Sequence, residues 1–339
     1  MNNDERPMTE RFIHEWFLND DGTFATYIVD GDQLDEDLVA GREALSETIG
    51  LLMEYALLRD DHSLFKEYVE NFEDSFLEED GMIYWKLTPG ASQHVSTNAL
   101  IDDIRIAYAF MNAYERYGES EYQEISRVIT HQLNSRYQDV EVYTDFYDTK
   151  HDYASSVITL SYIDRSALEI LHHDNQLDET LYQNTIHILE EAPIQSGFYP
   201  KSYNVEQAEY EFDQEVNMVD QMIIAYHEAK AGMRSNELLD FIRDEFEKRG
   251  VIHGIYDLNT KAPLVDYESP ALYGFTIMYL LEIEEYEFAE SVYERMIQFR
   301  NEDISDPYYG GYTVINGDTH IFDNLVPLLA EQQLKKIGM

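Results

Sequence analysis

The sequence predicts an all-α protein built as an (α/α)6 toroid, or barrel, of six inner and six outer helices. Helical segments recur in pairs along the chain, with a period of about 50–60 residues. The first segment of each pair is almost free of charge, as in 271–281, whereas the second is amphipathic and acid-rich, as in 236–247. Helices that are apolar all round are buried and striped ones lie outside, so the pairs predict two concentric layers.

The elements follow in order along the chain. The expected inner helices cover 41–59, 97–117, 152–172, 214–231, 268–282 and 319–335. The expected outer helices cover 61–76, 119–136, 178–191, 235–249 and 285–299. The last pair lacks an outer helix, and a short amphipathic helix at Thr9–Leu18 fills that place. The chain is therefore expected to be a single catalytic domain, 1–339, in which 1–40 supply a closing helix and an extended arm; an open end would make it a solenoid instead.

The loops that precede the inner helices are long and rich in aromatic residues and glycine, and those that follow them are short. In a toroid the long loops gather at one end, where a rigid scaffold presents a binding surface. Aromatic rings at such an end either stack on sugar rings or pack one loop against another. We expect a sugar-binding platform that includes Tyr84, Trp85, Tyr153, Tyr203 and Tyr267.

Glu47 stands at the edge of an apolar run, just after Ser46, near the start of the first inner helix. An acid there is either a solvated surface residue or a carboxyl group in a half-dry pocket. In the second case burial raises its pKa, and the group becomes a proton donor near neutral pH.

Asp103 follows Glu47 by one period and holds the same place in the second inner helix, within the run IDDIRIAYAF. Asp102 and Asp103 cannot share a helix face, because neighbours are about 100° apart. We expect Asp103 to point inward, since apolar residues share its side, and Arg105 of the same run to contact substrate.

The fourth inner helix supplies a third candidate. Asn217 and Asp220 are three residues apart and share a face, and Asp220 lies in an apolar run as Glu47 does. Capping favours Asp and Asn at helix starts, but it does not explain Glu47, Asp103 and Asp220 inside apolar stretches. Two carboxyl groups across a cleft, about 6.5–9.5 Å apart, are the apparatus of an inverting glycosidase.

At these residues the chain resembles glycoside hydrolase family 8, and most closely its bacterial members that degrade exopolysaccharides. That family comprises (α/α)6 barrels of inverting endo-hydrolases acting on β-1,4-linked glycans. The run ALSETIGLLMEYAL resembles the segment that holds the family's acid, with Thr48 in place of a glycine. IDDIRIAYAF resembles the run that holds its central sugar-binding Asp, with Asp103 in that place, and HDYASSVITLSY resembles its Ser-Tyr-Phe segment.

The resemblance implies Glu47 as general acid and Asp103 as the residue that holds the central sugar and orients water. The base is a departure, because many members have Asp and Arg where this chain has Asn217 and Asp220. One subgroup also has Asn there and takes its base from the preceding loop. The candidates are therefore Asp220 and the four loop acids Glu206, Glu209, Glu211 and Asp213.

Composition narrows the function classes further. The net charge is −45, from 68 acidic and 23 basic residues, which argues against nucleic acid and anionic membranes as partners. With no cysteine, thiolate catalysis and Cys-based metal sites are excluded, and scattered histidines without an HExxH motif support no metal or cofactor. No apolar window is long enough to span a membrane.

The expected partner is a polysaccharide, bound by a monomer. The N-terminal segment is not a signal peptide, yet the resemblance implies a protein that works outside the cell or at its surface, with an export signal absent from this sequence. Two other readings stay open. One is a uronyl hydrolase or lyase on the same toroid, against which the scarcity of Arg and Lys in the long loops counts. The other is a non-catalytic polysaccharide-binding protein that has lost its base.

Overall fold

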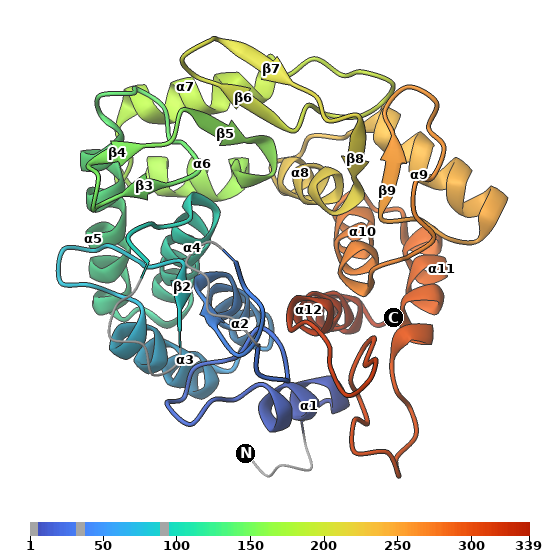
Figure 1. Ribbon diagram of the computed structural model, residues 1–339. Coiled ribbons are helices and arrows are strands. Elements are labelled where there is room, and N and C mark those ends of the chain that lie inside the picture. Colours follow the sequence, from blue (N-terminus) through green and yellow to red (C-terminus); the bar gives the residue numbers. More distant parts are fainter. Residues whose placement is uncertain (1–5, 32–37, 89–94) are drawn as a thin grey trace.

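The computed structural model describes residues 6–31, 38–88 and 95–339. These residues are mostly helical, and their helices surround a central axis (Figure 1). The expected helical class is confirmed to this extent: the described residues are mostly helical, with short strands at one end.

Six helices form the inner layer, and each contacts the next around the ring. They are α2 (Ser46–Leu58), α4 (Leu100–Tyr117), α6 (Arg165–His173), α8 (Met218–Lys230), α10 (Pro270–Glu282) and α12 (Phe322–Lys336). The last of them, α12, contacts the first, α2. The series of inner contacts therefore returns to its starting helix.

Six further helices lie outside this layer (Figure 1). They are α1 (Met8–Trp16), α3 (His62–Ser75), α5 (Ser120–Tyr137), α7 (Glu179–Glu190), α9 (Asn236–Arg249) and α11 (Tyr286–Met296). Helices α3, α5, α7 and α11 each contact the inner helix that precedes them, and α1 contacts α12. The N-terminal helix thus occupies the outer place beside the last inner helix.

The core lies between the two layers. The ring of Phe110 on α4 packs against those of Phe65 and Phe72 on α3, with centroids 6.2 and 5.7 Å away. Inner helix α10 is apolar on nearly every side, and eleven of its residues are buried. Burial of such helices, at about 25 cal/mol per Å² of apolar surface, is the main stabilising contribution.

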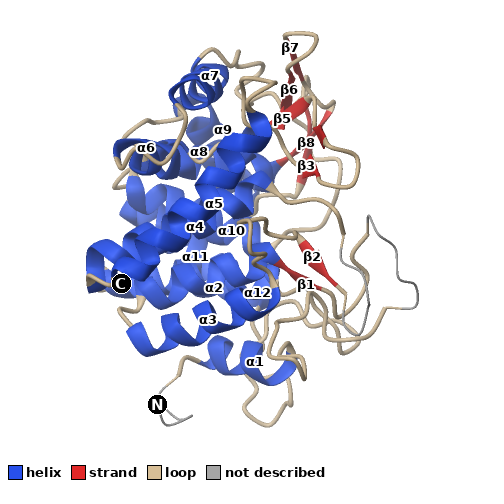
Figure 2. Cartoon of the chain, turned by 90° about the vertical axis from the view of Figure 1, so that its left-hand side faces the viewer, coloured by secondary structure: helices blue, strands red, loops and turns tan. Residues whose placement is uncertain are grey.

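Short strands decorate one end of the helical layers (Figure 2). They are β1 (Ala44–Leu45), β2 (Lys86–Leu87), β3 (Tyr147–Asp148), β4 (Tyr153–Ala154), β5 (Val157–Thr159), β6 (Ser202–Asn204), β7 (Glu209–Glu211), β8 (Glu215–Asn217) and β9 (Ile255–Asp257). They pair antiparallel as β1–β2, β3–β4, β5–β6–β7 and β8–β9. Strands β1 and β8 run directly into α2 and α8, so this end carries the N-termini of inner helices.

The expected helix at 152–172 is wrong in its first half. The chain there forms β4, β5 and a 3-10 turn at Leu160–Tyr162, and α6 begins only at Arg165. The run contains β-branched residues, which suit strands, and a short apolar run cannot be assigned by periodicity alone. Asp164 sets the new start, because its Oδ1 accepts a hydrogen bond from the Ala167 amide at 3.1 Å.

The other inner helices also begin later than expected. Residues 44–45 and 215–217 precede α2 and α8 as strands β1 and β8, which pair with β2 and β9. Strand pairing supplies the backbone partners that a longer helix would otherwise provide. As a result, Glu47 is the second residue of its helix and Asp220 the third.

Candidate active site

Glu47 lies at the strand-bearing end of the ring, in the first turn of α2. The β1–β2 pair fixes this turn, because the Ser46 amide donates to the carbonyl oxygen of Trp85 at 3.0 Å. The Glu47 side chain is half-buried. Burial, and next the carboxyl group of Asp102, raise its pKa to about 7, against the opposing effect of Arg105. Glu47 therefore holds a proton near neutral pH, as a general acid requires.

Asp102 is the acid that faces Glu47. Its Oδ2 accepts a hydrogen bond from Ser46 Oγ at 2.7 Å, and its Oδ1 accepts one from Arg105 Nη1 at 2.6 Å. Burial raises the pKa of Asp102, while Arg105, Ser46 and the backbone of Glu47 lower it. The hydrogen bonds from Ser46 and Arg105 hold the carboxylate oxygens of Asp102 in place and favour its ionised form, against the effect of burial.

Asp103 was expected to point inward, but its contacts in the structure lie on the outer side of α4. Asp103 Oδ2 accepts a hydrogen bond from Asn98 Nδ2 at 2.6 Å, and that amide also lies 3.5 Å from the Tyr137 hydroxyl of α5. Asp103 is thus directed toward the outer layer, with its Oδ1 buried and without a hydrogen-bond partner among the described residues. Burial raises its pKa well above the usual range.

The physical reason lies in what surrounds an inner helix. Phe110, which shares the side of Asp103, packs against α3 rather than toward the centre of the ring. Apolar companions therefore mark the interlayer core, and the polar side of α4 faces inward. The sequence did contain the better signal: Asp102 and Arg105 are three residues apart, the spacing of a helical ion pair.

Arg105 is buried, and its Nη1 forms an ion pair with Asp102 Oδ1 at 2.6 Å. The arginine, which was expected to contact substrate, contacts Asp102 in the structure. It acts on Glu47 by orienting Asp102 and by adding a positive charge, which favours the carboxylate form of both acids.

Asp220 is half-buried near the start of α8 and lies 3.5 Å from Ser161 Oγ. Burial raises its pKa, Lys201 and Ser161 lower it, and Asp213 raises it. Lys201 Nζ is paired with Asp213 Oδ2 at 2.8 Å. Asp213, Asn217 and Asp220 line one cavity of about 210 Å³.

The other loop acids lie farther out on the β6–β7 hairpin. Glu206, Glu209 and Glu211 are all exposed, and Ser202 Oγ donates to Glu211 Oε2 at 3.3 Å. Asn217 is the N-cap of α8, where its Oδ1 accepts from the Val219 amide at 2.9 Å. The structure thus brings Asp213 and Asp220 together and leaves the hairpin acids apart.

Tyr162 was not among the expected site residues, although the Ser-Tyr run that contains it was noted. Burial raises its pKa, and the carboxyl groups of Asp102, Asp145, Glu47 and Asp220 raise it further. Its hydroxyl group is therefore close to acids from both halves of the ring.

Asp145 was also missed. It lies in the loop before β3, where its carboxylate accepts hydrogen bonds from the Thr159 amide at 2.6 Å and from Thr159 Oγ1 at 2.8 Å. Burial raises its pKa, and these bonds and Lys201 lower it. A single loop acid among many gives no signal in sequence, because only the strand pairing of the loops brings it beside Tyr162.

The expected aromatic platform divides into exposed and packed residues. Tyr153 and Tyr267 are 47% and 55% exposed. Tyr203 packs on Tyr210 with ring centroids 4.8 Å apart, and Tyr84 packs against the core. Trp85 is half-buried, and Lys86 Nζ lies 5.2 Å from its ring centroid.

Among the described residues, no group of three or more His, Asp or Glu side chains is placed to hold a metal ion. None of their helices is both long and apolar enough to cross a bilayer.

Comparison of the sequence with known proteins gives one informative relative, and no family model matches the chain. The putative lipoprotein YdaJ of Bacillus subtilis (strain 168) is 36% identical over 326 residues, which cover 96% of this chain and 86% of that protein.

Several solved structures share the fold. A novel alpha-amylase from Clostridium perfringens superposes with a TM-score of 0.86 at 23% identity, and PssZ from Listeria monocytogenes with 0.76 at 25%; each comparison covers 96% of both chains. Endoglucanase Cel10, a family 8 glycosyl hydrolase from Klebsiella pneumoniae, has a TM-score of 0.63 at 16% identity, over 97% of this chain and 99% of that one. The resemblance to family 8 is confirmed, and the chain belongs to the family of the putative lipoprotein YdaJ, with the fold of glycoside hydrolase family 8.

Proposed function

We propose that this protein is an inverting endo-glycoside hydrolase. It would cleave internal bonds of a β-linked polysaccharide and invert the anomeric centre. The observation that carries the proposal is the pair of Glu47 and Asp102, in which burial raises the pKa of Glu47 to about 7 and Ser46 and Arg105 hold the Asp102 carboxyl group in place. Neighbouring acids with perturbed pKa values are typical of sites of acid–base chemistry. The proposal includes that the helices form an (α/α)6 toroid and that the chain acts as one catalytic domain.

In this mechanism Glu47 gives its proton to the glycosidic oxygen as the bond to the anomeric carbon breaks. Asp102, ionised and fixed by Ser46 and Arg105, takes the place that the sequence suggested for Asp103. It stabilises the positive charge that develops on the sugar ring. A water molecule on the opposite face loses a proton to the base, and its oxygen bonds to the anomeric carbon.

Asp220 and Asp213 are the two base candidates that the geometry favours. They line the same cavity with Asn217. Asp220 lies deeper and close to Tyr162, whereas Asp213 is exposed and held by Lys201. We favour Asp220, because it is half-buried beside Ser161 and burial raises its pKa, which makes its carboxylate a better proton acceptor than an ordinary Asp.

The substrate is proposed to be a bacterial exopolysaccharide or a β-1,4-glycan. PssZ and endoglucanase Cel10 support it, since both share the fold, and the exposed Tyr153 and Tyr267 offer surfaces for sugar rings. The alpha-amylase similarity makes an α-linked glucan the chief competitor. The likeness to a putative lipoprotein supports work at the cell surface or outside the cell, as in biofilm turnover.

The test is a reducing-end assay on mixed-linkage glucan, carboxymethyl cellulose, chitosan, a bacterial exopolysaccharide and starch. We expect cleavage of one β-linked polymer and a loss of about 10²–10⁴-fold in turnover for Glu47→Gln, the usual contribution of a general acid. Glu247→Gln is the matched control, because Glu247 is exposed on outer helix α9. Full activity in Glu47→Gln would overturn the assignment, and activity on starch alone would overturn the β linkage.

A non-catalytic polysaccharide-binding protein is the second candidate. Asn217 favours it, because the resemblance places an ionisable base there and this side chain instead caps α8. Such a protein would be retarded in an affinity gel that contains the polymer, and it would release no reducing ends. Glu47→Gln would not change that retardation.

A further inference from the structure

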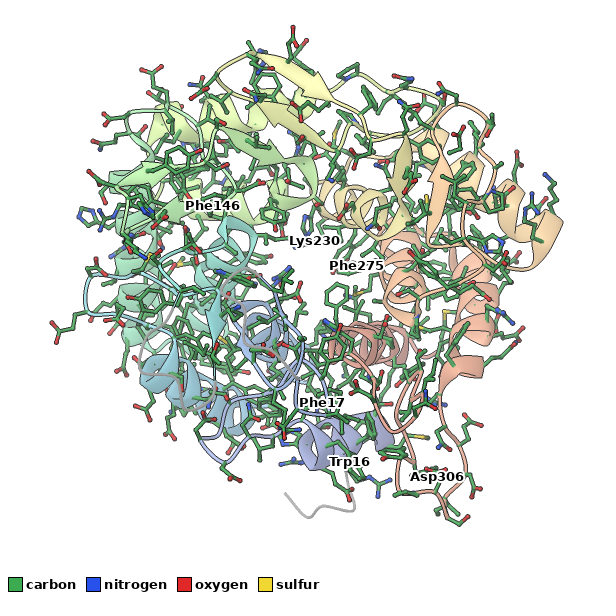
Figure 3. The ribbon with its side chains drawn as sticks, viewed as in Figure 1. Trp16, Phe17, Phe146, Lys230, Phe275 and Asp306 are labelled. Atoms are coloured by element: carbon green, nitrogen blue, oxygen red, sulfur yellow. The ribbon has the colours of Figure 1, made fainter. Side chains whose placement is uncertain are left out.

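A second cavity lies at the centre of the ring, away from Glu47. Its volume is about 440 Å³, and residues of α2, α4, α8, α10 and α12 line it. Glu54 in its wall is seven residues beyond Glu47 on α2, which is about 10 Å along the helix axis. Figure 3 shows Lys230 and Phe275, two lining residues, at the inner rim of the ring. The cavity is within the size range of small-molecule sites.

The cavity is lined by polar groups, one of which has no hydrogen-bond partner among the described residues. His227 is 5% exposed, and its Nδ1 is buried without a hydrogen-bond partner among the described residues. Glu54 is half-buried and forms no hydrogen bond or ion pair with them. Arg105 uses Nη1 for Asp102 and also lines the cavity. Because buried polar groups are normally satisfied, the Nδ1 of His227 is suited to bind a ligand.

Each cation that lines the cavity is paired with an acid, and Arg116 Nη1 lies 3.5 Å from Asp60 Oδ1. Lys230 Nζ is paired with Asp164 Oδ2 at 2.9 Å, and Arg105 with Asp102. Glu54 lies at longer range from Arg105 and Lys230, and burial raises its pKa. Because the lining cations are already paired with acids, the cavity gives little net attraction for an anion or a cation. The ligand that fits is neutral and rich in hydrogen-bonding groups.

Aromatic rings form the remaining wall. Tyr226 and Phe275 lie with ring centroids 6.2 Å apart, and Lys230 Nζ is 5.1 Å from the Tyr108 ring centroid and 5.5 Å from that of Tyr226. Tyrosine offers a flat apolar face with a polar tip. Flat faces beside carboxyl and guanidinium groups suit a sugar ring, which is apolar on its C–H faces and polar at its edge.

We infer that this cavity binds a neutral, hydroxyl-rich molecule of mono- or disaccharide size, at a site separate from the acid pair. The site is connected to that pair through Arg105. An added Cβ on Gly50 would lie 3.0 Å from Arg105 Cδ, so the arginine crosses α2 at Gly50, between Glu47 and Glu54. The guanidinium group of Arg105 therefore both lines the cavity and donates a hydrogen bond to Asp102. The inference goes beyond the proposed hydrolase activity and does not depend on it.

Isothermal titration calorimetry tests the inference with the full chain carrying Glu47→Gln, which removes the proposed acid and suppresses turnover. The probes are glucose, galactose, N-acetylglucosamine, maltose and cellobiose, with sodium phosphate and tetramethylammonium chloride as charged comparisons. We expect one of the sugars to bind and neither ion to bind. Adding Asn112→Trp, which fills the cavity from α4, should weaken sugar binding at least 10-fold.

Asn236→Trp is the matched control, because Asn236 is exposed on outer helix α9. A further variant, Glu54→Ala, removes a ligand partner without breaking a hydrogen bond within the described chain, so it should weaken binding with no fall in thermal midpoint. The inference is overturned if no sugar binds, if binding survives Asn112→Trp, or if an ion binds in preference. Because binding is measured without turnover, a failed hydrolase assay leaves this result unaffected.

Discussion

At the scale of single residues, the site depends on which of two adjacent acids faces inward. Asp102 contacts Ser46 and Arg105, whereas Asp103 contacts Asn98 toward the outer layer. The apolar residues on the same side of α4 as Asp103 suggested that Asp103 faces inward. That inference failed because an inner helix of a two-layer ring buries its apolar side against the outer helices and turns polar groups to the centre.

Asp102→Asn and Asp103→Asn form a matched pair that tests this choice. Asp102→Asn removes the charge that balances Arg105 in a buried site, so we expect a loss of about 3–5 kcal/mol in unfolding free energy and at least 10²-fold in turnover. Asp103→Asn keeps an acceptor for Asn98 and should change turnover by less than about threefold. Urea unfolding and the reducing-end assay measure both. Greater loss of turnover in Asp103→Asn would reverse the assignment.

Glu47 also predicts a pH dependence of stability. Its folded-state pKa of about 7 exceeds the ordinary value of 4.5, so the folded state favours the protonated form. Ionisation therefore costs no stability below about pH 4.5, and the cost grows as pH rises and is complete above about pH 7. Glu47→Gln cannot ionise, and its gain in unfolding free energy at about pH 8 relative to about pH 5 should be on the order of 2 kcal/mol.

Urea unfolding at the two pH values measures that gain, and Glu247→Gln, at an exposed site, should show none. An equal effect of Glu47→Gln at both values would mean that Glu47 is solvated. Turnover of the unaltered chain should fall as pH rises through about 7, because the general acid then loses its proton.

At the scale of elements, close approaches between inner helices occur where one has a glycine. On α2, a Cβ at Gly50 would meet side-chain atoms of α4, Arg105 Cδ at 3.0 Å and Ile106 Cγ1 at 3.2 Å. On α10, a Cβ at Gly274 would meet Val326 of α12 at 2.8 Å to Cγ1 and at 3.0 Å to the backbone. The second contact is the stiffer, since backbone cannot move aside as a side chain can.

Gly50→Ala and Gly274→Ala should therefore differ in cost. Alanine gains about 1 kcal/mol of helix propensity at either position, whereas overpacking costs about 1–3 kcal/mol. We expect Gly274→Ala to lower the thermal midpoint clearly, and Gly50→Ala to lower it less while reducing turnover through Arg105. A rise in the thermal midpoint of Gly274→Ala would show that α10 and α12 are farther apart in solution than in this structure.

At the scale of the whole molecule, the ring is assembled from contacts between distant segments. Helix α12 contacts both α2 and α1, which are at the other end of the sequence. Trp16 Nε1 donates to the Pro307 carbonyl oxygen at 3.1 Å, and its ring lies 4.6 Å from that of Tyr308. The N-terminal helix is thereby fixed to the C-terminal part of the ring.

The net charge of −45 acts on this whole assembly. Repulsion among acidic groups is stronger in the compact folded state, and salt screens it. We expect the thermal midpoint to rise by several degrees between about 0.01 M and 0.5 M sodium chloride. Differential scanning calorimetry measures the shift, and sucrose at matched osmolality separates screening from solute exclusion. A fall in the midpoint would show that salt-sensitive ion pairs outweigh the repulsion.

The sequence by itself determined the helical class, the pairing of helices and the candidacy of Glu47 and Asp220. These follow from local periodicity, because the alternation of apolar and striped helices is written in neighbouring residues. It also identified the Ser-Tyr run that contains Tyr162, without its role. Helix starts were less well predicted, since β1, β5 and β8 took residues expected in helices.

Only the tertiary structure decided the direction of Asp102 and Asp103, the approach of Asp145 to Tyr162, and the separation of Asp213 and Asp220 from the hairpin acids. It alone also showed the central cavity, to which five inner helices contribute. The physical reason is common to all of them. A residue's neighbours on one helix are set by the helical repeat, but the side of the helix that faces the centre is set by how the second layer packs, and that information is spread over the whole chain.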